Sequence, residues 1–182
     1  MKKTFIFILV SFITSLSVAQ SSYRGFVNTG YSFGSGEYGF NQWHVNTVHG
    51  VDLFQNRLFI GGGIGFGIST ESDRYKTYSL PVFADVRYTL CNLKVNPYID
   101  MKIGYSELFD EEKDGGGDNS GGLYISPSVG VSMPLARKTS IHVGIGYTYN
   151  QAKFGYIDTF TLERNSKRFN AGGFTLSVGV SF

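Results

Sequence analysis

Residues 78–90 decide the fold, and they read YSLPVFADVRYTL. Apolar side chains occupy every second position, and Asp85 and Arg87 lie between them. This period of two is typical of a β-strand whose two faces meet different surroundings. Tyr78 and Tyr88 are ten residues apart, which is ~33 Å of strand, or ~25 Å of height at a tilt of ~40°. We therefore predict a tilted strand that crosses an apolar layer between two aromatic belts.

The same alternation recurs along the rest of the chain, which shows no convincing helical period. We expect strands near residues 23–33, 42–54, 57–69, 75–90, 95–107, 122–134, 139–150 and 168–182. On the second of these strands the face expected to point outward carries Trp43, His49 and Leu53, and His49 fits it poorly. There are eight such strands, an even number. We therefore predict an all-β fold, namely an eight-stranded antiparallel up-and-down transmembrane β-barrel.

The connections between these strands alternate in length. Short joins are expected at 54–57, 91–96 and 134–139, and mostly longer ones at 34–41, 70–74, 107–121 and 151–167. Barrels of the bacterial outer membrane place short turns in the periplasm and longer loops outside. The pattern therefore predicts that both termini face the periplasm.

Charged residues indicate which face of the sheet points inward. Asp85, Arg87, Asp100 and Lys102 all lie opposite the apolar face. An Arg or Lys on the lipid side costs ~2–4 kcal/mol at the bilayer midplane, so these four side chains should point into the barrel. We predict a register in which paired residue numbers sum to 187, so that Arg87 faces Asp100 and Asp85 faces Lys102.

An eight-stranded barrel has an interior that side chains can fill, so no wide pore is expected. The inward positions combine small residues with large rings: Gly61, Gly63, Gly65, Gly67, Gly144 and Gly146 with Phe26, Phe59, Phe83, Tyr98 and Tyr124. Alternation of small and large side chains is typical of a filled barrel. The glycine run lies within an expected strand and lacks a Gly-Lys-Ser/Thr ending, which excludes a phosphate-binding loop.

Both ends of the chain carry export signals. Residues 174–182 alternate again and end on Phe182, which resembles the terminal assembly signal of bacterial outer-membrane barrels. Residues 1–19 have Lys2 and Lys3, a short apolar stretch and a small-residue site ending at Ala19, so we expect a signal peptide there. The barrel domain is then 20–182. Of the 16 basic residues, 14 remain in it and balance its 14 acidic ones, and nothing suggests nucleic acid.

Together these features resemble the small outer-membrane barrels of the OmpA/OmpX-like superfamily across essentially the whole mature chain. The resemblance is architectural, since no functional motif is shared. It implies a monomer in the bacterial outer membrane with roles in envelope integrity, adhesion or resistance to host defence. The partners it implies are outer-membrane lipid and lipopolysaccharide, the barrel-assembly machinery during insertion, and a surface or host ligand held by the loops.

We predict no catalytic residue, no cofactor-binding residue, no cofactor and no metal site, and therefore no enzyme. Cys91 is the only cysteine, which excludes an internal disulfide and a Cys-based zinc cluster. His44 and His49 lie on opposite faces of one strand and cannot share a metal ion. Ser140 and His142 share a face, but no carboxylate is evident nearby to complete a catalytic triad. We therefore interpret His142 as a packing or hydrogen-bonding residue of the lumen.

Two stretches have biased charge. Residues 107–121 carry a net charge of −5, and we interpret them as a solvated loop, with cation binding as the alternative. Residues 153–168 carry a net charge of +2, and we interpret these side chains as solvated, with contact to lipid phosphates as the alternative.

Three other functions compete with a non-enzymatic barrel that acts through its loops. They are a lipid-modifying enzyme of the outer membrane, a narrow channel, and a soluble lipocalin-like barrel. In the soluble barrel the apolar face would line a ligand cavity, because alternation alone does not say which face points inward.

Overall fold

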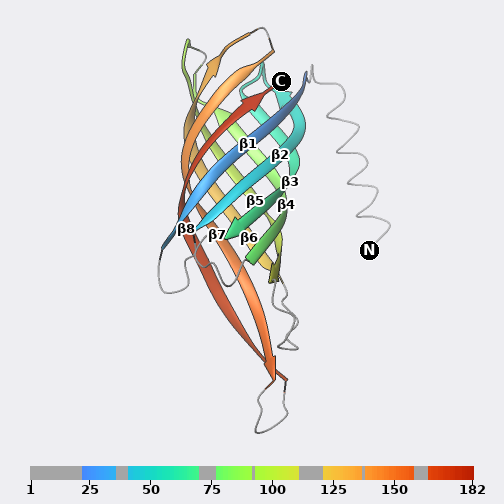
Figure 1. The fold of residues 1–182 in the computed structure, drawn as a ribbon. Coiled ribbons are helices and arrows are strands. Elements are labelled where there is room, and N and C mark those ends of the chain that lie inside the picture. Colours follow the sequence, from blue (N-terminus) through green and yellow to red (C-terminus); the bar gives the residue numbers. More distant parts are fainter. Residues whose placement is uncertain are drawn as a thin grey trace, which may run out of the picture.

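The computed structural model describes residues 22–35, 41–69, 77–91, 93–110, 121–136, 138–157 and 164–182. Every element in this part of the chain is a β-strand, and each strand pairs with its neighbours in sequence (Figure 1). No helix in these ranges is long and apolar enough to cross a membrane. The expected signal peptide, residues 1–19, lies outside the described residues.

Eight antiparallel strands form one closed barrel in the order β1 to β8. Their bounds are β1 Ser22–Ser35, β2 Gln42–Leu53, β3 Leu58–Ser69, β4 Thr77–Thr89, β5 Asn96–Asp110, β6 Gly122–Pro134, β7 Ser140–Ile157 and β8 Arg164–Ser181. The predicted fold class and all eight strands are confirmed. The last strand closes the barrel against the first, from Phe26 opposite Ser181 to Ser35 opposite Gly172.

The hairpin of β7 and β8 is longer than expected. Residues 151–157 and 164–167 were predicted to be a loop, and this prediction is wrong because both segments are strand. Beyond Asn150 and Ala171, the two strands pair only with each other among the described residues. The hairpin therefore extends past the closed barrel, as the orange and red ribbons of Figure 1 show.

The predicted register of β4 and β5 is confirmed. Asp85 lies opposite Lys102 and Arg87 lies opposite Asp100, so the paired numbers sum to 187. All four side chains are buried in the barrel interior. A register shifted by one residue would turn these charges toward the outside, so burial and pairing agree on the assignment.

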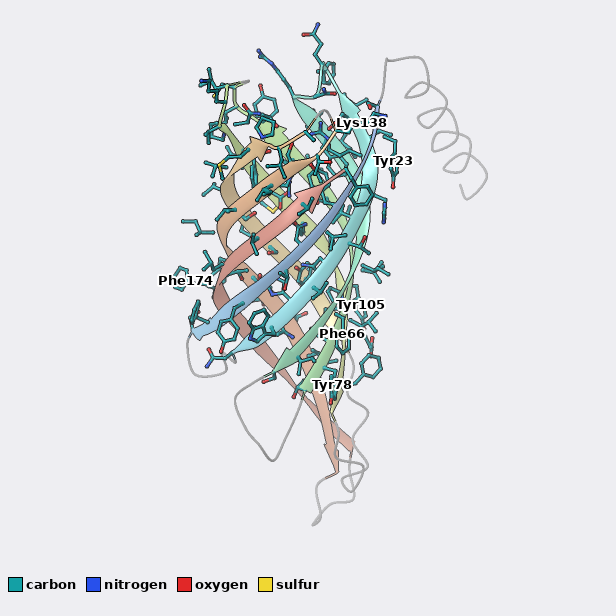
Figure 2. All side chains as sticks on the ribbon, turned by 45° about the horizontal axis from the view of Figure 1, so that its top comes forward. Tyr23, Phe66, Tyr78, Tyr105, Lys138 and Phe174 are labelled. Atoms are coloured by element: carbon teal, nitrogen blue, oxygen red, sulfur yellow. The ribbon has the colours of Figure 1, made fainter. Side chains whose placement is uncertain are left out.

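The outward face is apolar along every strand. Large exposed side chains include Val45, Ile64, Val82, Ile103, Val129, Ile145 and Val178. Aromatic side chains gather at both ends of this surface, for example Phe66, Tyr78, Tyr105 and Phe174 at one end and Tyr23 at the other (Figure 2). Leu53, expected to point outward, is instead only 6% exposed, at the end of β2 where the chain turns.

His49 is the one imidazole on the outward face of β2, and its polar atoms are paired there. The Tyr23 hydroxyl lies 2.6 Å from His49 Nδ1, and the Thr47 hydroxyl lies 3.0 Å from His49 Nε2. The ring also contacts Phe182 edge-on, with centroids 6.5 Å apart. His49 therefore belongs to the aromatic belt that contains Tyr23 and Phe182. These contacts explain how a polar ring is tolerated on an apolar face.

The two ends of the barrel differ, and we name them by their connections. The turn end carries the short turns 54–57, 90–95 and 135–139 together with Phe182. The loop end carries the longer connections and the protruding hairpin (Figure 1). At the turn end Phe182 exchanges two backbone hydrogen bonds with Gly25, of 2.9 and 3.0 Å, which complete the seam between β8 and β1.

Candidate functional site in the barrel lumen

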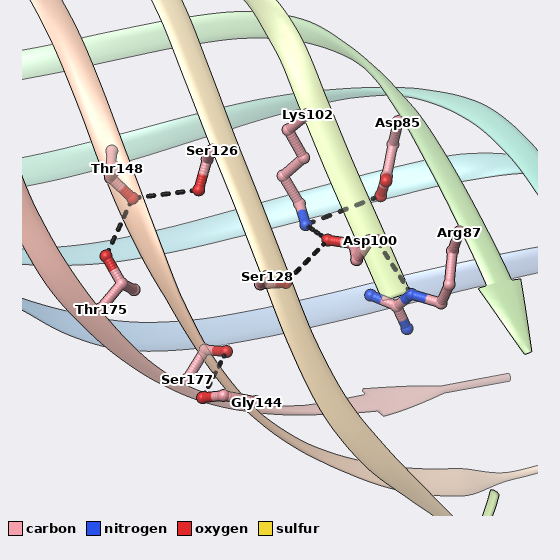
Figure 3. A network of polar contacts seen from close by, with 10 residues as sticks. All are labelled: Asp85, Arg87, Asp100, Lys102, Ser126, Ser128, Gly144, Thr148, Thr175 and Ser177. Atoms are coloured by element: carbon pink, nitrogen blue, oxygen red, sulfur yellow. Dashed lines mark hydrogen bonds and ion pairs between the residues drawn. The ribbon is translucent and has the colours of Figure 1, made fainter. Parts of the chain in front are cut away.

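Asp100 is the centre of a charged network inside the turn half of the lumen (Figure 3). Arg87 Nε donates to Asp100 Oδ1 over 3.0 Å, and Lys102 Nζ donates to Asp100 Oδ2. Ser128 donates a third hydrogen bond to Asp100 Oδ2 over 3.2 Å. The carboxylate of Asp85 lies 3.9 Å from Lys102 Nζ. The network therefore combines two cations with two anions, and Asp100 is fully bound, whereas neither oxygen of Asp85 accepts a hydrogen bond from a described residue.

Arg87 is held between aromatic rings as well as by Asp100. Its guanidinium carbon lies 4.3 Å from the centroid of Phe26 and 4.4 Å from that of Tyr98. Cation–π contacts of this kind are worth up to ~2 kcal/mol when the cation is desolvated. The guanidinium therefore fills the lumen at this level and is fixed on three sides.

Large rings fill the remaining space, and neighbouring glycines of β3 make room for them. The buried cluster consists of Phe26, Val48, Phe59, Phe83 and Tyr124. A Cβ added to Gly61 would lie 2.6 Å from the Phe59 ring, and one added to Gly63 would lie 2.7 Å from the Phe83 ring. The predicted pairing of small and large residues is confirmed. We call Asp85, Arg87, Asp100 and Lys102, together with Phe26, Phe59, Phe83 and Tyr98, the plug.

His142 packs against the plug and is not paired with Ser140. Its ring lies 5.2 Å from Phe26 and 6.0 Å from Tyr98 between centroids. Neither ring nitrogen has a hydrogen-bond partner among the described residues. The packing role expected for His142 is thus confirmed, and the described part of the chain brings no hydroxyl to it as a nucleophile would require.

The loop half of the lumen is lined by small polar side chains. Ser126 and Thr148 share a hydrogen bond of 3.0 Å, Thr148 and Thr175 one of 2.9 Å, and Thr175 and Ser32 one of 2.8 Å. This chain of hydroxyls runs across four adjacent strands, β6, β7, β8 and β1. Figure 3 shows the links from Ser126 to Thr175.

An amide continues the polar lining on the other side. Gln42 Nε2 donates to Ser79 Oγ over 2.6 Å, from β2 to β4. Gly67 of the intervening strand β3 permits this bond, because a Cβ there would lie 2.5 Å from both atoms. We call Ser32, Gln42, Ser79, Ser126, Thr148 and Thr175 the polar belt.

Two small cavities accompany the polar belt. One of about 30 Å³ borders Asn28, Asn46, Lys102 and Tyr124, between the plug and the belt. Another of about 10 Å³ borders Ser32, Gln42 and Asn150. A water molecule needs ~10–15 Å³ of such space. The loop half can therefore hold individual waters.

The outward face also has a hollow, of about 670 Å³, over strands β5 to β8 and β1. Its lining includes Pro127, which has no N–H to donate and lies where the ladder between β6 and β7 is interrupted between Ile125 and Ser128. Met101 and Phe174 form part of its apolar rim. This hollow is part of the apolar outward face of the barrel.

The other residues singled out in the sequence do not converge. His44 points into the lumen and His49 outward, as predicted. Cys91 follows β4 and forms no disulfide. In the described part of the chain no group of three or more His, Cys, Asp or Glu side chains is placed to hold a metal. Most of the acidic stretch, residues 111–120, lies outside the described residues.

Two features of the lumen escaped sequence reasoning. Lys102 binds Asp100 of its own strand in addition to lying 3.9 Å from Asp85. The polar belt was missed altogether, although its serines and threonines occupy inward positions with a period of two. Its signal becomes readable only when strand register and barrel closure are known.

Solved structures of outer-membrane proteins resemble this barrel. Neisserial surface protein A superposes with a TM-score of 0.65 at 17% identity, over 88% of this chain and 97% of that one. Outer membrane protein AlkL superposes with a TM-score of 0.62 at 13% sequence identity, and the match covers 90% of each chain. The outer membrane protein OprG from Pseudomonas aeruginosa superposes with a TM-score of 0.54 at 11% sequence identity, and the match covers 90% of this chain and 94% of that one.

No protein-family model matches the sequence, and no curated protein matches it either. The likeness is therefore one of fold. Strand number, closure, the apolar outward face and the filled interior all agree with these structures. The chain has the fold of the small eight-stranded outer-membrane β-barrels.

Proposed function

We propose that the chain is a non-enzymatic barrel of the bacterial outer membrane that acts through the segments protruding at its loop end. One contrast carries this proposal. The plug fills the lumen, whereas the hairpin of β7 and β8 continues beyond the last residues that pair with β6 and β1. A closed interior and an extended rim favour interaction at the surface over transport through the centre.

The outward face supports a membrane location. Its apolar side chains are exposed along all eight strands, and aromatic rings lie at both ends. A soluble barrel with a ligand cavity would have the opposite arrangement, so the lipocalin-like alternative is wrong. We further propose export by a signal peptide and a periplasmic turn end, because short turns face the periplasm in such barrels.

The interior supports a role without catalysis or conduction. His142 is enclosed by rings, and the four charges of the plug neutralise one another. Neither arrangement presents a reactive group to a substrate. We propose a monomer whose partners are outer-membrane lipid, lipopolysaccharide, the assembly machinery during insertion, and a surface ligand at the loop end.

Shortening the hairpin tests this proposal. Replacing residues 152–168 by a two-residue turn removes the paired residues 152–157 and 164–168, which lie beyond the barrel wall, together with the segment between them. We expect the variant to insert normally, judged by its heat-dependent migration in gels, and to lose adhesion of whole cells to host surfaces. The matched control replaces residues 111–120 and should retain more adhesion.

Two outcomes would contradict the proposal. Full adhesion by the shortened variant would show that the hairpin has no surface role. Release of the unaltered protein from membranes by high salt without detergent would show that it is not an integral barrel.

A further inference from the structure

We propose that the rim of the turn end binds the headgroups of anionic phospholipids in the adjoining leaflet. The rim consists of the three short turns 54–57, 90–95 and 135–139. The inference rests on the proposed function only in requiring that the barrel spans a membrane. The proposed phospholipids therefore lie at the end of the molecule opposite the protruding hairpin.

Among the described residues, each of the three turns has a strongly exposed apolar side chain and an exposed basic side chain. The apolar members are Phe54, Leu93 and Leu135, which are 74%, 68% and 70% exposed. The basic members are Arg57, Lys94 and Lys138, all exposed. Figure 2 shows Lys138 at the same end as Tyr23. A pairing repeated in three unrelated turn sequences presents one chemistry around the rim.

No carboxylate of a described residue is paired with the charges of the rim. None of the three turns contains Asp or Glu. None of the three basic side chains forms an ion pair with a described residue. The nearby carboxylate of Asp52 is buried and bound by Arg24 over 2.8 Å. The rim therefore presents uncompensated positive charge, which an anionic surface complements.

The position of these side chains matches the depth of lipid phosphates. Leu58 lies opposite Tyr88 of the aromatic belt, and Arg57 follows directly beyond it, with its carbonyl accepting the N–H of Thr89 over 2.8 Å. Aromatic belts lie at the headgroup level of a bilayer. A basic group one residue farther out is thus at the level of the phosphates, and an exposed apolar neighbour can enter the acyl boundary.

The first turn accepts backbone strain to reach this arrangement. Phe54, Gln55 and Asn56 all have positive φ angles, of 50°, 58° and 66°. The left-handed region costs a residue other than glycine ~1–2 kcal/mol. This turn leaves the Phe54 ring 74% exposed, beside Arg57. The Arg57 N–H closes this turn by donating to the carbonyls of Leu53 and Phe54, over 3.2 and 3.3 Å, and a bilayer interface would stabilise the exposed ring.

Lipid selectivity of the folded barrel tests the proposal. The protein is reconstituted in phosphatidylcholine, and association of spin-labelled phosphatidylglycerol is compared with that of spin-labelled phosphatidylcholine by electron paramagnetic resonance. We expect the unaltered protein to prefer phosphatidylglycerol by a factor of about 3 or more. High salt should reduce this preference, because exposed charges are screened within ~3 Å at about 1 M.

The decisive variant is R57Q/K94Q/K138Q, which should lower the preference toward a factor of about 1 while inserting normally. The control K153Q/K167Q/R168Q removes as many charges from the hairpin at the opposite end and should keep the preference. Equal loss in both variants, or no preference in the unaltered protein, would overturn the lipid assignment. Adhesion tests the proposed function separately, since the rim variant leaves the hairpin intact.

Discussion

The plug and the polar belt occupy the two halves of the same lumen, yet they are stabilised in different ways. In the plug, full charges are paired within a few ångströms and rings occupy the space that glycines leave. In the belt, neutral hydroxyls and one amide form single hydrogen bonds beside cavities of water size. The barrel therefore concentrates its ion pairs and ring contacts in the half of the lumen that lies at the turn end.

The energetic consequence is an unequal response to mutation. Removing one partner of a buried ion pair leaves an uncompensated charge and costs ~3–5 kcal/mol. Losing one neutral hydrogen bond costs ~0.5–1.5 kcal/mol, and less where water can replace the partner. The plug should therefore fix the fold, whereas the belt should tolerate change.

The largest effect is expected for Asp100→Asn. The variant leaves Arg87 and Lys102 with Asp85 as their only remaining anion in the plug, and should lower the free energy of unfolding by ~3–5 kcal/mol. Urea titration of the protein in lipid vesicles measures this change. The double variant D100N/K102M restores neutrality and should recover more than half of the loss. A double variant as unstable as the single one would contradict charge balance as the cause.

An intermediate effect is expected where a glycine accommodates a ring. Gly63→Ala places a methyl group 2.7 Å from both the Phe83 ring and the Thr47 carbonyl, and should destabilise the barrel by ~1–3 kcal/mol. Gly62→Ala is the matched control, because its Cβ would point outward and lie 3.8 Å from the Phe83 carbonyl. Equal unfolding midpoints for the two variants would show that ring packing does not limit stability.

The smallest effect is expected in the polar belt. Thr175→Val keeps the side-chain volume but removes the hydroxyl that links Ser32 and Thr148, and should cost ~1 kcal/mol or less. The same urea titration applies. A loss as large as that of Asp100→Asn would erase the difference between the two halves of the lumen.

Much of this architecture could be predicted from the sequence, for a physical reason. Strands that separate lipid from a packed lumen must alternate, so the apolar face, the inward charges and the pairing of Asp85 with Lys102 were all readable. The extension of β7 and β8 was not, because residues beyond the membrane layer need no apolar face and carry no alternation. The polar belt was also unreadable, since its hydrogen bonds join residues far apart in the sequence, such as Ser32 and Thr175.

The function was less predictable than the fold. Interaction at the surface depends on loop side chains, whose chemistry follows no period, whereas the lumen follows the pleat. The basic rim of the turn end illustrates the difference. Each of its turns looks unremarkable alone, and only the closed barrel brings Arg57, Lys94 and Lys138 to one end of the molecule.

Single-channel recording in planar bilayers tests most directly the claim that the plug closes the lumen. We expect the unaltered protein to give no discrete current steps in concentrated potassium chloride, although insertion is confirmed by its gel migration. A variant that empties the plug, F59A/F83A, should give measurable steps, because it replaces two of its large rings with methyl groups. Discrete, reproducible conductance of the unaltered protein would contradict a closed lumen.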